Sequence, residues 1–405
     1  MVLGIDLTDD YIALHVKGEE NASVFPAVIC RAKEEDAWYT GEEAYRRALA
    51  GQGMMADRLL KLLEKGGTAI LGSTAYTAVE LIGKLIAGVL EARLGTADFA
   101  LIEKYVLTVR RADADLMDRL TASLSAAGLN PARAAVITHE EAFVHYTLSR
   151  EKEFYSSMVA LFDLSAESLC CYEFMMVRGV SRKACAAESE EVEESFHTDI
   201  LKKESGRALG DKLITDAAKK RMEGKLYSAV FLTGSGFERT DWAPSFLAYI
   251  CQRRRVVQEN GLFAIGAGVL ADQLLTSGEK EDCLVFCDSR IGSEIACRVS
   301  VHEKESRLIL IPAGERWYGL QVHVEMIPDG QDYMDFEVVP FSGRQQKKTV
   351  RAMLTGFPQR PDRTTRIAVD LSFRRADRAE VTIRDLGFGE LFPASGTVIH
   401  ETIEL

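Results

Sequence analysis

The chain has 405 residues, of which 47% are hydrophobic and 27% charged, a composition typical of a globular protein that is too long for one hydrophobic core. Its 49 Lys and Arg residues against 61 Asp and Glu residues give a formal net charge of -12. Such a surface repels phosphate backbones and anionic lipid, which argues against nucleic-acid and membrane partners.

The chain begins with MVLGIDL, which reads as a strand and lacks the basic and apolar regions of a secretory signal. The most hydrophobic long stretch, residues 73–94, carries three charged residues, so we expect no membrane span. The eight cysteines include no Cys-x2-Cys pair, and we interpret Cys283, Cys287 and Cys297 as buried apolar residues rather than metal ligands. We therefore expect a reduced, cytoplasmic location.

Residues 1–150 predict an alternating α/β unit. It opens with a hairpin of two strands, 2–7 and 11–16, joined by an acidic turn. The remaining expected elements are a continuation of the sheet at 28–29, a helix from Gly41, an amphipathic helix over 79–90, strands 105–109 and 135–137, and helices 113–127 and 140–149.

Residues 151–277 repeat the same opening, since a strand at 158–163 ends in Asp163 and a polar turn leads into a strand at 169–174. A polar, acidic stretch at 186–194 interrupts this unit. The later elements are a helix at 209–221, a strand at 229–233, a tight loop made by Gly234, Ser235 and Gly236, and helices at 244–252 and 264–275. We therefore expect two lobes, 1–150 and 151–277.

Helical periodicity ends near residue 277, and after a polar linker at 276–282 short alternating strands predict an antiparallel β-sandwich over residues 283–405. The expected strands are 295–301, 308–311, 320–326, 334–339, 366–373 and 379–384. Phe357, Ile367, Val369 and Leu371 are expected in its core.

Three short motifs lie at the ends of expected strands of the first part: Gly4-Ile5-Asp6-Leu7, Phe162-Asp163-Leu164 and Leu232-Thr233-Gly234-Ser235-Gly236. They resemble the two phosphate loops and the adenosine loop of the seventy-kilodalton heat-shock chaperone family. Further similar segments are Pro26 with Gly41-Glu42-Glu43-Ala44, the run 261–267, and Leu354-Thr355-Gly356-Phe357-Pro358 with Pro361. The resemblance implies duplicated actin-like ATPase lobes of the ribonuclease-H-like fold, followed by a substrate-binding β-sandwich.

The implied nucleotide site departs from the family pattern. Asp6 and Asp163 stand where carboxylates would hold magnesium, but Thr8-Asp9-Asp10 and Ser165-Ala166-Glu167-Ser168 replace the small phosphate-binding residues. The added negative charges oppose a polyphosphate. The segment that clasps adenine is reduced, and Lys61 and Lys65 are poor matches for the catalytic lysine because they lie on an expected helix rather than on an early strand. Thr8, Ser165, Gly234, Ser235 and Gly236 are therefore vestigial cofactor-binding positions, and no cofactor or metal is expected.

Alternatives remain open for several residues. Asp6 and Asp163 could instead cap strand ends and turns, and Glu140, with Glu141, either resembles the family's water-positioning segment or stabilises a helix N-terminus. His139 and His145, six residues apart, lie on different helix faces and are interpreted as ordinary histidines.

Met326, Ile327 and Tyr333, near one hairpin tip of the sandwich, are the candidate peptide-binding residues, while the tip at 302–306 is charged. Both tips could equally be solvated turns. The chain ends at Leu405 in a strand-like tail, so no helical lid is expected. The leading hypothesis is a chaperone-like protein-binding or scaffold protein with a protein or peptide partner and a non-hydrolysing site. The alternative is a divergent ATPase that binds ATP and magnesium through Asp6 and Asp163, with Glu140 orienting water.

Overall fold

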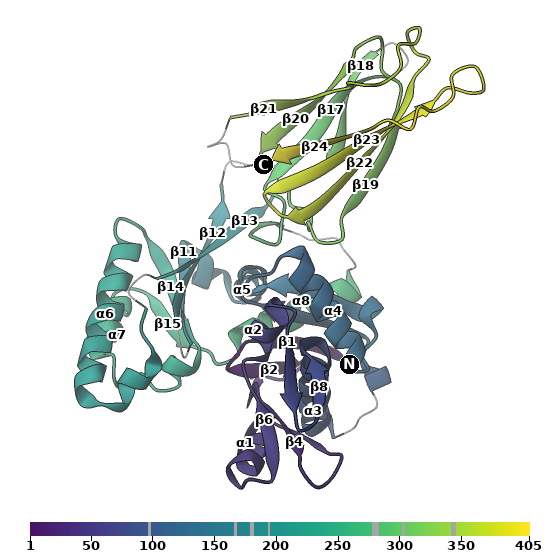
Figure 1. Ribbon diagram of the computed structural model, residues 1–405. Helices are drawn as coiled ribbons and strands as arrows, with labels where there is room; N and C mark the ends of the chain where they lie inside the picture. The colour runs from purple at the N-terminus through teal and green to yellow at the C-terminus, as the bar shows by residue number, and fades with distance from the viewer. Residues whose placement is uncertain are drawn as a thin grey trace. The chain divides into compact units, whose positions relative to one another are not determined.

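The computed structural model describes residues 1–95, 99–165, 168–178, 182–192, 195–277, 283–301, 304–341 and 346–405. The chain divides into two compact units, Met1–Val285 and Phe286–Leu405 (Figure 1). The first is mixed α/β and the second is antiparallel β, which confirms the predicted fold class at this level. Among the described residues, no helix combines the length and apolarity needed to cross a membrane.

The first sheet of the α/β unit has the strand order β10-β9-β1-β2-β3. β1 is parallel to β9 and antiparallel to β2, and β9 is parallel to β10. The strands of this sheet are β1 (Val2–Leu7), β2 (Tyr11–Val16), β3 (Ser23–Pro26), β9 (Lys104–Val109) and β10 (Ala134–Thr138). The same part of the chain contains the helices α3 (Ala78–Leu94), α4 (Ala114–Ala126) and α5 (His139–Leu148).

The second sheet has the order β15-β14-β11-β12-β13-β16, so its first five strands repeat the order and directions of the first sheet. Its elements are β11 (Met158–Leu164), β12 (Leu169–Val177), β13 (Ala184–Glu191), β14 (Tyr227–Thr233), β15 (Arg255–Gln258), β16 (Leu284–Phe286), α6 (Glu204–Met222), α7 (Pro244–Ile250) and α8 (Leu262–Thr276).

Smaller elements complete the unit. They are a three-stranded sheet of β4 (Ile29–Ala32), β5 (Trp38–Thr40) and β6 (Gly53–Ala56), a hairpin of β7 (Thr68–Leu71) and β8 (Thr74–Thr77), helices α1 (Gly41–Leu49) and α2 (Leu59–Glu64), and the 3-10 turns η1 (Phe99–Leu101), η2 (Pro131–Arg133), η3 (Lys152–Tyr155), η4 (Thr198–Lys202) and η5 (Ser235–Phe237).

Helix α8 packs closely against β1 and α5 because small residues face one another. A side chain on Gly4 would collide with the carbonyl oxygen of Ala264, and one on Gly266 would collide with the carbonyl oxygen of Ala142. These contacts fix α8 against the middle of β1 and against α5.

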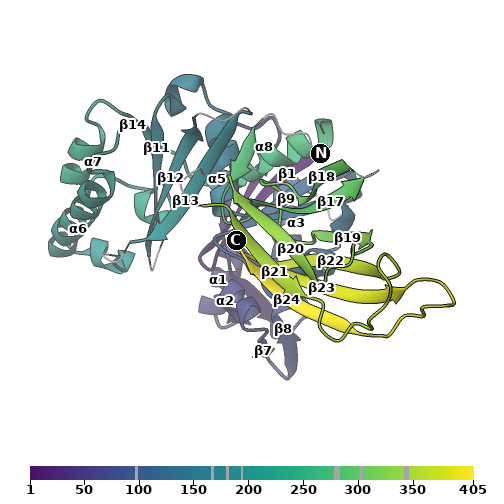
Figure 2. The ribbon, with the colours of Figure 1, turned by 90° about the horizontal axis from the view of Figure 1, so that it is seen from above.

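The second unit is a sandwich of two four-stranded antiparallel sheets, ordered β18-β17-β20-β21 and β19-β22-β23-β24 (Figure 2). The strands are β17 (Ser293–Val301), β18 (Lys304–Ile311), β19 (Gln321–Met326), β20 (Tyr333–Pro340), β21 (Lys348–Met353), β22 (Arg366–Arg375), β23 (Arg378–Gly387) and β24 (Val398–Glu404). Ile367, Val369 and Leu371 are buried as predicted, whereas Phe357 is only half-buried.

Three sequence-based expectations about elements were wrong. Residues 186–191 of the stretch read as an acidic interruption belong to β13, which pairs along its length with β12; buried small residues begin the strand and exposed glutamates end it. Ile29 lies in the small sheet rather than in the first large one. Residues 283–285 pack with the first unit, not with the sandwich. The expected linker at 276–282 extends past residue 277, outside the described residues.

Candidate functional site

Two carboxylates lie at the carboxyl ends of corresponding strands of the two sheets. Asp6 is the fifth residue of β1 and Asp163 the sixth of β11, and both side chains are buried. Burial raises the pKa of Asp163, and the charge of Asp6 raises it further while Arg110 and His139 lower it. The fold therefore brings together the two acidic residues that the sequence singled out.

Both carboxylate oxygens of Asp6 are hydrogen-bonded to side chains of the chain itself. The Tyr11 hydroxyl donates to Oδ2 at 3.0 Å, and Nε2 of His139 lies 2.7 Å from Oδ1. The imidazole stacks on Phe263 with ring centroids 3.8 Å apart, and its Nδ1 lies 3.4 Å from the hydroxyl of Tyr172. Burial, and then the charge of Asp6, raises the pKa of Tyr11 well above its ordinary value.

Asp163 is paired with a cation from the other sheet. Arg110, the residue after β9, lies 3.3 Å from Oδ2 of Asp163 through Nη2 and donates to Oγ of Ser168 at 2.6 Å through Nη1. Burial opposes the charge on Arg110, but Asp163 favours it, and the net effect raises the pKa of the guanidinium. We call Asp6, Tyr11, Arg110, His139, Asp163 and Tyr172 the strand-end cluster.

The hydroxyl groups predicted as vestigial phosphate ligands serve their own turns. Thr8 Oγ1 accepts from the backbone of Tyr11 at 3.0 Å and donates to its carbonyl oxygen at 3.0 Å. Ser165 Oγ donates to the carbonyl oxygen of Ser168 at 3.1 Å, and Arg110 lies 3.4 Å from the same Oγ. Ala166 and Glu167 lie outside the described residues.

The loop from Gly234 to Gly236 packs tightly against the end of β11. Gly234 has a φ of +93°, and a side chain there would lie 2.6 Å from Oδ1 of Asp163. Gly236 is buried against Leu164, and its carbonyl oxygen accepts a hydrogen bond from Trp242 at 3.0 Å, while Ser235 is exposed. Close packing against β11 therefore requires glycine at positions 234 and 236, and the presence of glycine there is not specific to a nucleotide-binding loop.

Asp9 and Asp10, in the acidic turn between β1 and β2, have different surroundings. Oδ1 of Asp9 accepts from the backbone of Lys61 at 3.0 Å, and its Oδ2 lies 3.8 Å from the Lys61 ammonium group, so a neighbouring cation compensates its charge. This corrects the prediction that Asp9 faces a ligand. Asp10 instead lines a pocket of 270 Å³ with Glu42 and Glu238, and no Lys or Arg is among the described residues that line it.

Glu140 and His139 of α5 have hydrogen-bond partners within the α/β unit. Oε1 of Glu140 accepts from Oγ of Ser189 on β13 at 2.6 Å, and Glu140 and Glu141 are both buried. His139 bonds to Asp6, whereas His145 lies 3.9 Å from Glu141 on the same helix. The two histidines have different neighbours, and the prediction that His139 is an ordinary histidine missed its bond to Asp6.

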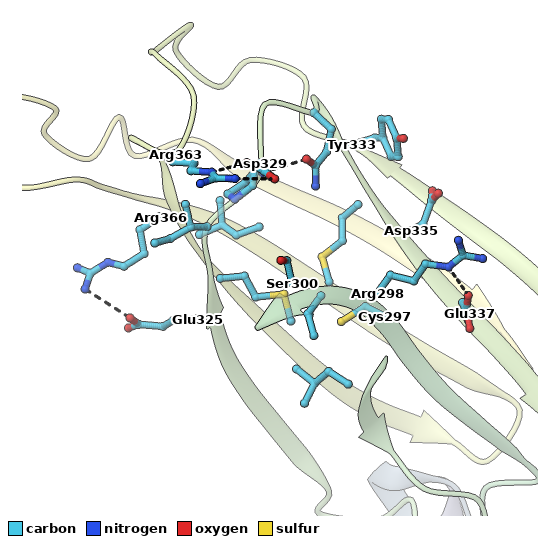
Figure 3. Close-up of a pocket in the computed structure, with 18 of the residues that line it drawn as sticks. Cys297, Arg298, Ser300, Glu325, Asp329, Tyr333, Asp335, Glu337, Arg363 and Arg366 are labelled. Carbon is cyan, nitrogen blue, oxygen red and sulfur yellow. Dashed lines mark hydrogen bonds and ion pairs between the residues drawn. The ribbon is translucent and has the colours of Figure 1, made fainter. Parts of the chain in front are cut away.

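The sandwich contains a groove of 990 Å³, which we call the sandwich groove (Figure 3). Its apolar lining includes the three candidate peptide-binding residues, Met326, Ile327 and Tyr333. Ion pairs border it, with Arg363 2.5 Å from Asp329, Arg366 3.5 Å from Glu325 and Arg298 3.0 Å from Glu337. Residues 302 and 303 of the charged hairpin tip at 302–306 lie outside the described residues.

The groove lies where β17 and β20 separate. These strands pair from Ser293↔Pro340 to Ala296↔Glu337, and no pairing continues through the described residues 297–300 and 333–336. The separation begins where a bulge interrupts the pairing of β17 with β18, between Ile295 and Ala296. Because a bulge bends a strand and increases its twist, it turns β17 away from β20 and leaves two strand edges facing the groove.

Sequence reasoning missed Tyr11, Arg110, His139 and Tyr172. A signal was present for Arg110 and His139, since each directly follows a parallel strand, β9 and β10. Polar residues after adjacent parallel strands meet at one edge of the sheet, where ligands and charged groups gather in α/β folds.

The chain thus combines an α/β unit, built from two sheets of equal strand order with a charged cluster at the strand ends, and a β-sandwich with a groove. Residues 10–288 match the family described as Family of unknown function (DUF5716) C-terminal. The chain belongs to this family, because the match covers more than half of it. Residues 290–405 match the Domain of unknown function (DUF8552). No curated protein matches the chain.

Proposed function

We propose that the protein is a chaperone-like binding or scaffold protein that holds an extended segment of a protein partner in the sandwich groove. The observation that carries this proposal is the separation of β17 from β20 along the groove. Backbone groups on such strand edges are a template for an added strand. Side chains of alternate residues of the bound segment would enter the apolar lining at Met326, Ile327 and Met334.

The resemblance to the seventy-kilodalton heat-shock chaperones is supported by the equal strand order and directions of the two α/β sheets. A duplicated ribonuclease-H-like, actin-like core predicts such a repeat. The close approach of α8 to Gly4 is consistent with the closing helix that the resemblance implies. We therefore infer actin-like lobes followed by a substrate-binding sandwich.

We infer further that the α/β unit does not hydrolyse ATP. Both carboxylate oxygens of Asp6 are hydrogen-bonded, one to Tyr11 and the other to His139. The carboxylate of Asp163 is paired with the guanidinium of Arg110, which takes the place of a metal cation. The nearby pocket is lined by Asp10, Glu42 and Glu238, whose charges oppose a polyphosphate. The protein would then work without nucleotide or metal, and a cytoplasmic location fits this role.

One observation favours the alternative of an ATPase. Oδ1 of Asp163 and the hydroxyl oxygens of Thr108 and Thr233 are buried and have no hydrogen-bond partner among the described residues. Thr108 pairs with Asp6 across β1 and β9, and Thr233 pairs with Asp163 across β11 and β14. Water bound to magnesium would satisfy such oxygens, so nucleotide binding must be measured directly.

The proposal is tested with a panel of fluorescent unfolded peptides and two matched variants. Ile327 lines the groove and is 50% exposed, whereas Ile309 on β18 is 48% exposed and is not among the groove's lining residues. We expect Ile327→Asp to weaken peptide binding at least about tenfold, about 1.4 kcal/mol, and Ile309→Asp to leave it unchanged. Equal binding by both variants, or no binding of any peptide by the wild type, would refute a peptide-binding groove.

A further inference from the structure

The connection between β23 and β24 presents apolar side chains to solvent. Within the loop of residues 387–396, which we call the 387–396 loop, Leu391 is 88% exposed and Phe388 43% exposed. Figure 2 shows the yellow segment that joins β23 to β24 projecting beyond the ends of the strands. Single exposed apolar residues are common, but two on one projecting loop form a small hydrophobic surface.

Hydrogen bonds from buried groups hold this loop in one conformation. Asp385 accepts two bonds of 2.8 Å from Arg360 and further bonds from the backbone N–H groups of Gly387, at 2.9 Å, and Ser395, at 2.8 Å. Arg360 also donates to the carbonyl oxygen of Pro393 at 2.7 Å. The side chains of Arg360 and Asp385 are 5% and 0% exposed.

A buried ion pair of this kind contributes little net stability, because desolvation offsets its Coulomb energy, but it can specify a conformation. Here the specified conformation holds Leu391 in solvent. A loop that is already ordered loses less entropy on association than a mobile one. The rigid exposed tip is therefore suited to enter an apolar pocket.

The loop and the sandwich groove lie at the same end of the sandwich. Gly387, at the base of the loop, pairs with Arg366, which lines the groove. The segment between β21 and β22 contacts both features, because Arg363 is paired with Asp329 at the groove and Arg360 bonds to Pro393 in the loop. The exposure of Leu391 shows that the loop does not occupy the groove of its own chain.

We propose that the 387–396 loop docks in the sandwich groove of a second copy of the chain. This inference rests on the groove being a binding site, as proposed above, and names one of its ligands. Since loop and groove share one end of the sandwich, a two-fold axis at that end places each loop against the other copy's groove. Leu391 and Phe388 then meet Met326, Ile327 and Met334.

The contact is apolar rather than electrostatic. Each arginine among the described residues that line the groove already has a carboxylate partner, since Arg298 pairs with Glu337, Arg363 with Asp329 and Arg366 with Glu325. Glu390, beside Leu391, is therefore placed at the solvent-exposed edge of the contact. The groove would thus be covered in the dimer and opened by dissociation, so dimer formation and peptide binding compete.

Sedimentation velocity over a concentration series tests the proposal. The wild type should shift from monomer to dimer as concentration rises, and Leu391→Asp should lower the association constant at least about tenfold, as loss of a buried apolar anchor does. Leu49→Asp is the matched control, because Leu49 lies on α1 in the other unit and is 89% exposed. This control should associate like the wild type.

Mixing two variants makes the test specific. Ile327→Asp keeps an intact loop and Leu391→Asp keeps an intact groove, so each should be monomeric alone while their mixture regains one of the two contacts and associates. A wild type that is monomeric at all concentrations, association that Leu391→Asp does not change, or a mixture that stays monomeric would overturn the proposal. Binding of unfolded peptides is measured separately, so failure of the dimer leaves the proposed function to its own test.

Discussion

The guanidinium of Arg110 lies 3.3 Å from the carboxylate of Asp163, and this ion pair joins the strand ends of the two α/β sheets. Arg110 follows β9 of the first sheet and Asp163 belongs to β11 of the second. The positive charge beside Asp163 is therefore supplied by the chain itself. The same guanidinium also donates to Oγ of Ser168, the residue before β12.

Arg110→Met should destabilise the α/β unit strongly. Removing one partner of a buried pair leaves an uncompensated charge, which typically costs about 3–5 kcal/mol; because Arg110 remains 30% exposed, we expect the lower end, about 3 kcal/mol. The measurement is equilibrium urea denaturation. Arg111→Met, at the exposed neighbouring position, should change the free energy of unfolding by less than about 0.5 kcal/mol.

The double variant Arg110→Met with Asp163→Asn separates charge from packing. Neutralising Asp163 removes the buried unpaired carboxylate, so the double variant should recover most of the stability that Arg110→Met loses. Equal stability of the single and double variants would show that Arg110 acts through packing alone.

ATP with magnesium should leave the thermal midpoint unchanged. A ligand present at 100 times its Kd raises the free energy of unfolding by about 2.7 kcal/mol, which thermal denaturation detects readily. Differential scanning fluorimetry with millimolar ATP and magnesium is the measurement, with magnesium alone as the control. A clear rise of Tm that requires ATP would favour the ATPase alternative.

The sandwich should lose stability at acid pH through Glu337. Hydrogen bonds from Lys347, Arg298 and Arg307 lower the pKa of this carboxyl from 4.5 to about 2. Its ionised form is therefore favoured by folding, and the stability it contributes is present above pH 4.5 and is lost as the pH falls towards about 2.

Glu337→Gln should flatten the fall of Tm in this pH range, because an amide does not titrate. Glu380→Gln, at an exposed position on β23, is the control and should keep the wild-type dependence. If Glu337→Gln and the wild type lose stability in parallel, other carboxyl groups control the acid transition.

The sequence predicted most of the central elements but not how their side chains pair. The hairpin of β1 and β2 was found with its observed bounds, because apolar runs on either side of an acidic turn are a strong local signal. The strand β13 was missed because its second half is rich in glutamate and mostly exposed, which gives no apolar alternation. Backbone pairing with β12 makes this segment a strand.

For the candidate sites as well, the sequence indicated individual residues but not the partners that they contact. Asp6 and Asp163 were singled out because each ends a strand of a repeated pattern, and Met326, Ile327 and Tyr333 because they lie near a hairpin tip. His139 is 133 residues from Asp6 and Arg110 is 53 residues from Asp163 in sequence. Parallel pairing of β1, β9 and β10 places Arg110 and His139 at the same sheet edge as Asp6, whereas Asp163 reaches Arg110 from the second sheet. The separation of β17 from β20 depends on a bulge, which no local composition signal marked.

Val369→Asp should unfold the sandwich. Val369 is fully buried on β22, beside Ile367 and Leu371, so an aspartate there would place an unpaired charge in the core. Val398→Asp on β24 introduces the same side chain at a position that is 46% exposed and should be tolerated. Near-ultraviolet circular dichroism and limited proteolysis measure the outcome. A folded Val369→Asp variant would contradict the assignment of this residue to the core.

Tyr333→Ala should weaken peptide capture while leaving the sandwich folded. The Tyr333 ring is only half-buried at the start of β20, and the Arg351 guanidinium lies 3.7 Å from its centroid, held by bonds to Asp335. Loss of the ring removes apolar contact area from the groove and a partly exposed cation–π contact of about 0.5–1 kcal/mol, too little to unfold the domain. Fluorescence anisotropy with a peptide that binds the wild type should show a several-fold higher Kd, and Tyr333→Phe should restore wild-type binding because it keeps the ring. Unchanged binding by folded Tyr333→Ala would place the bound segment elsewhere in the groove, away from the start of β20.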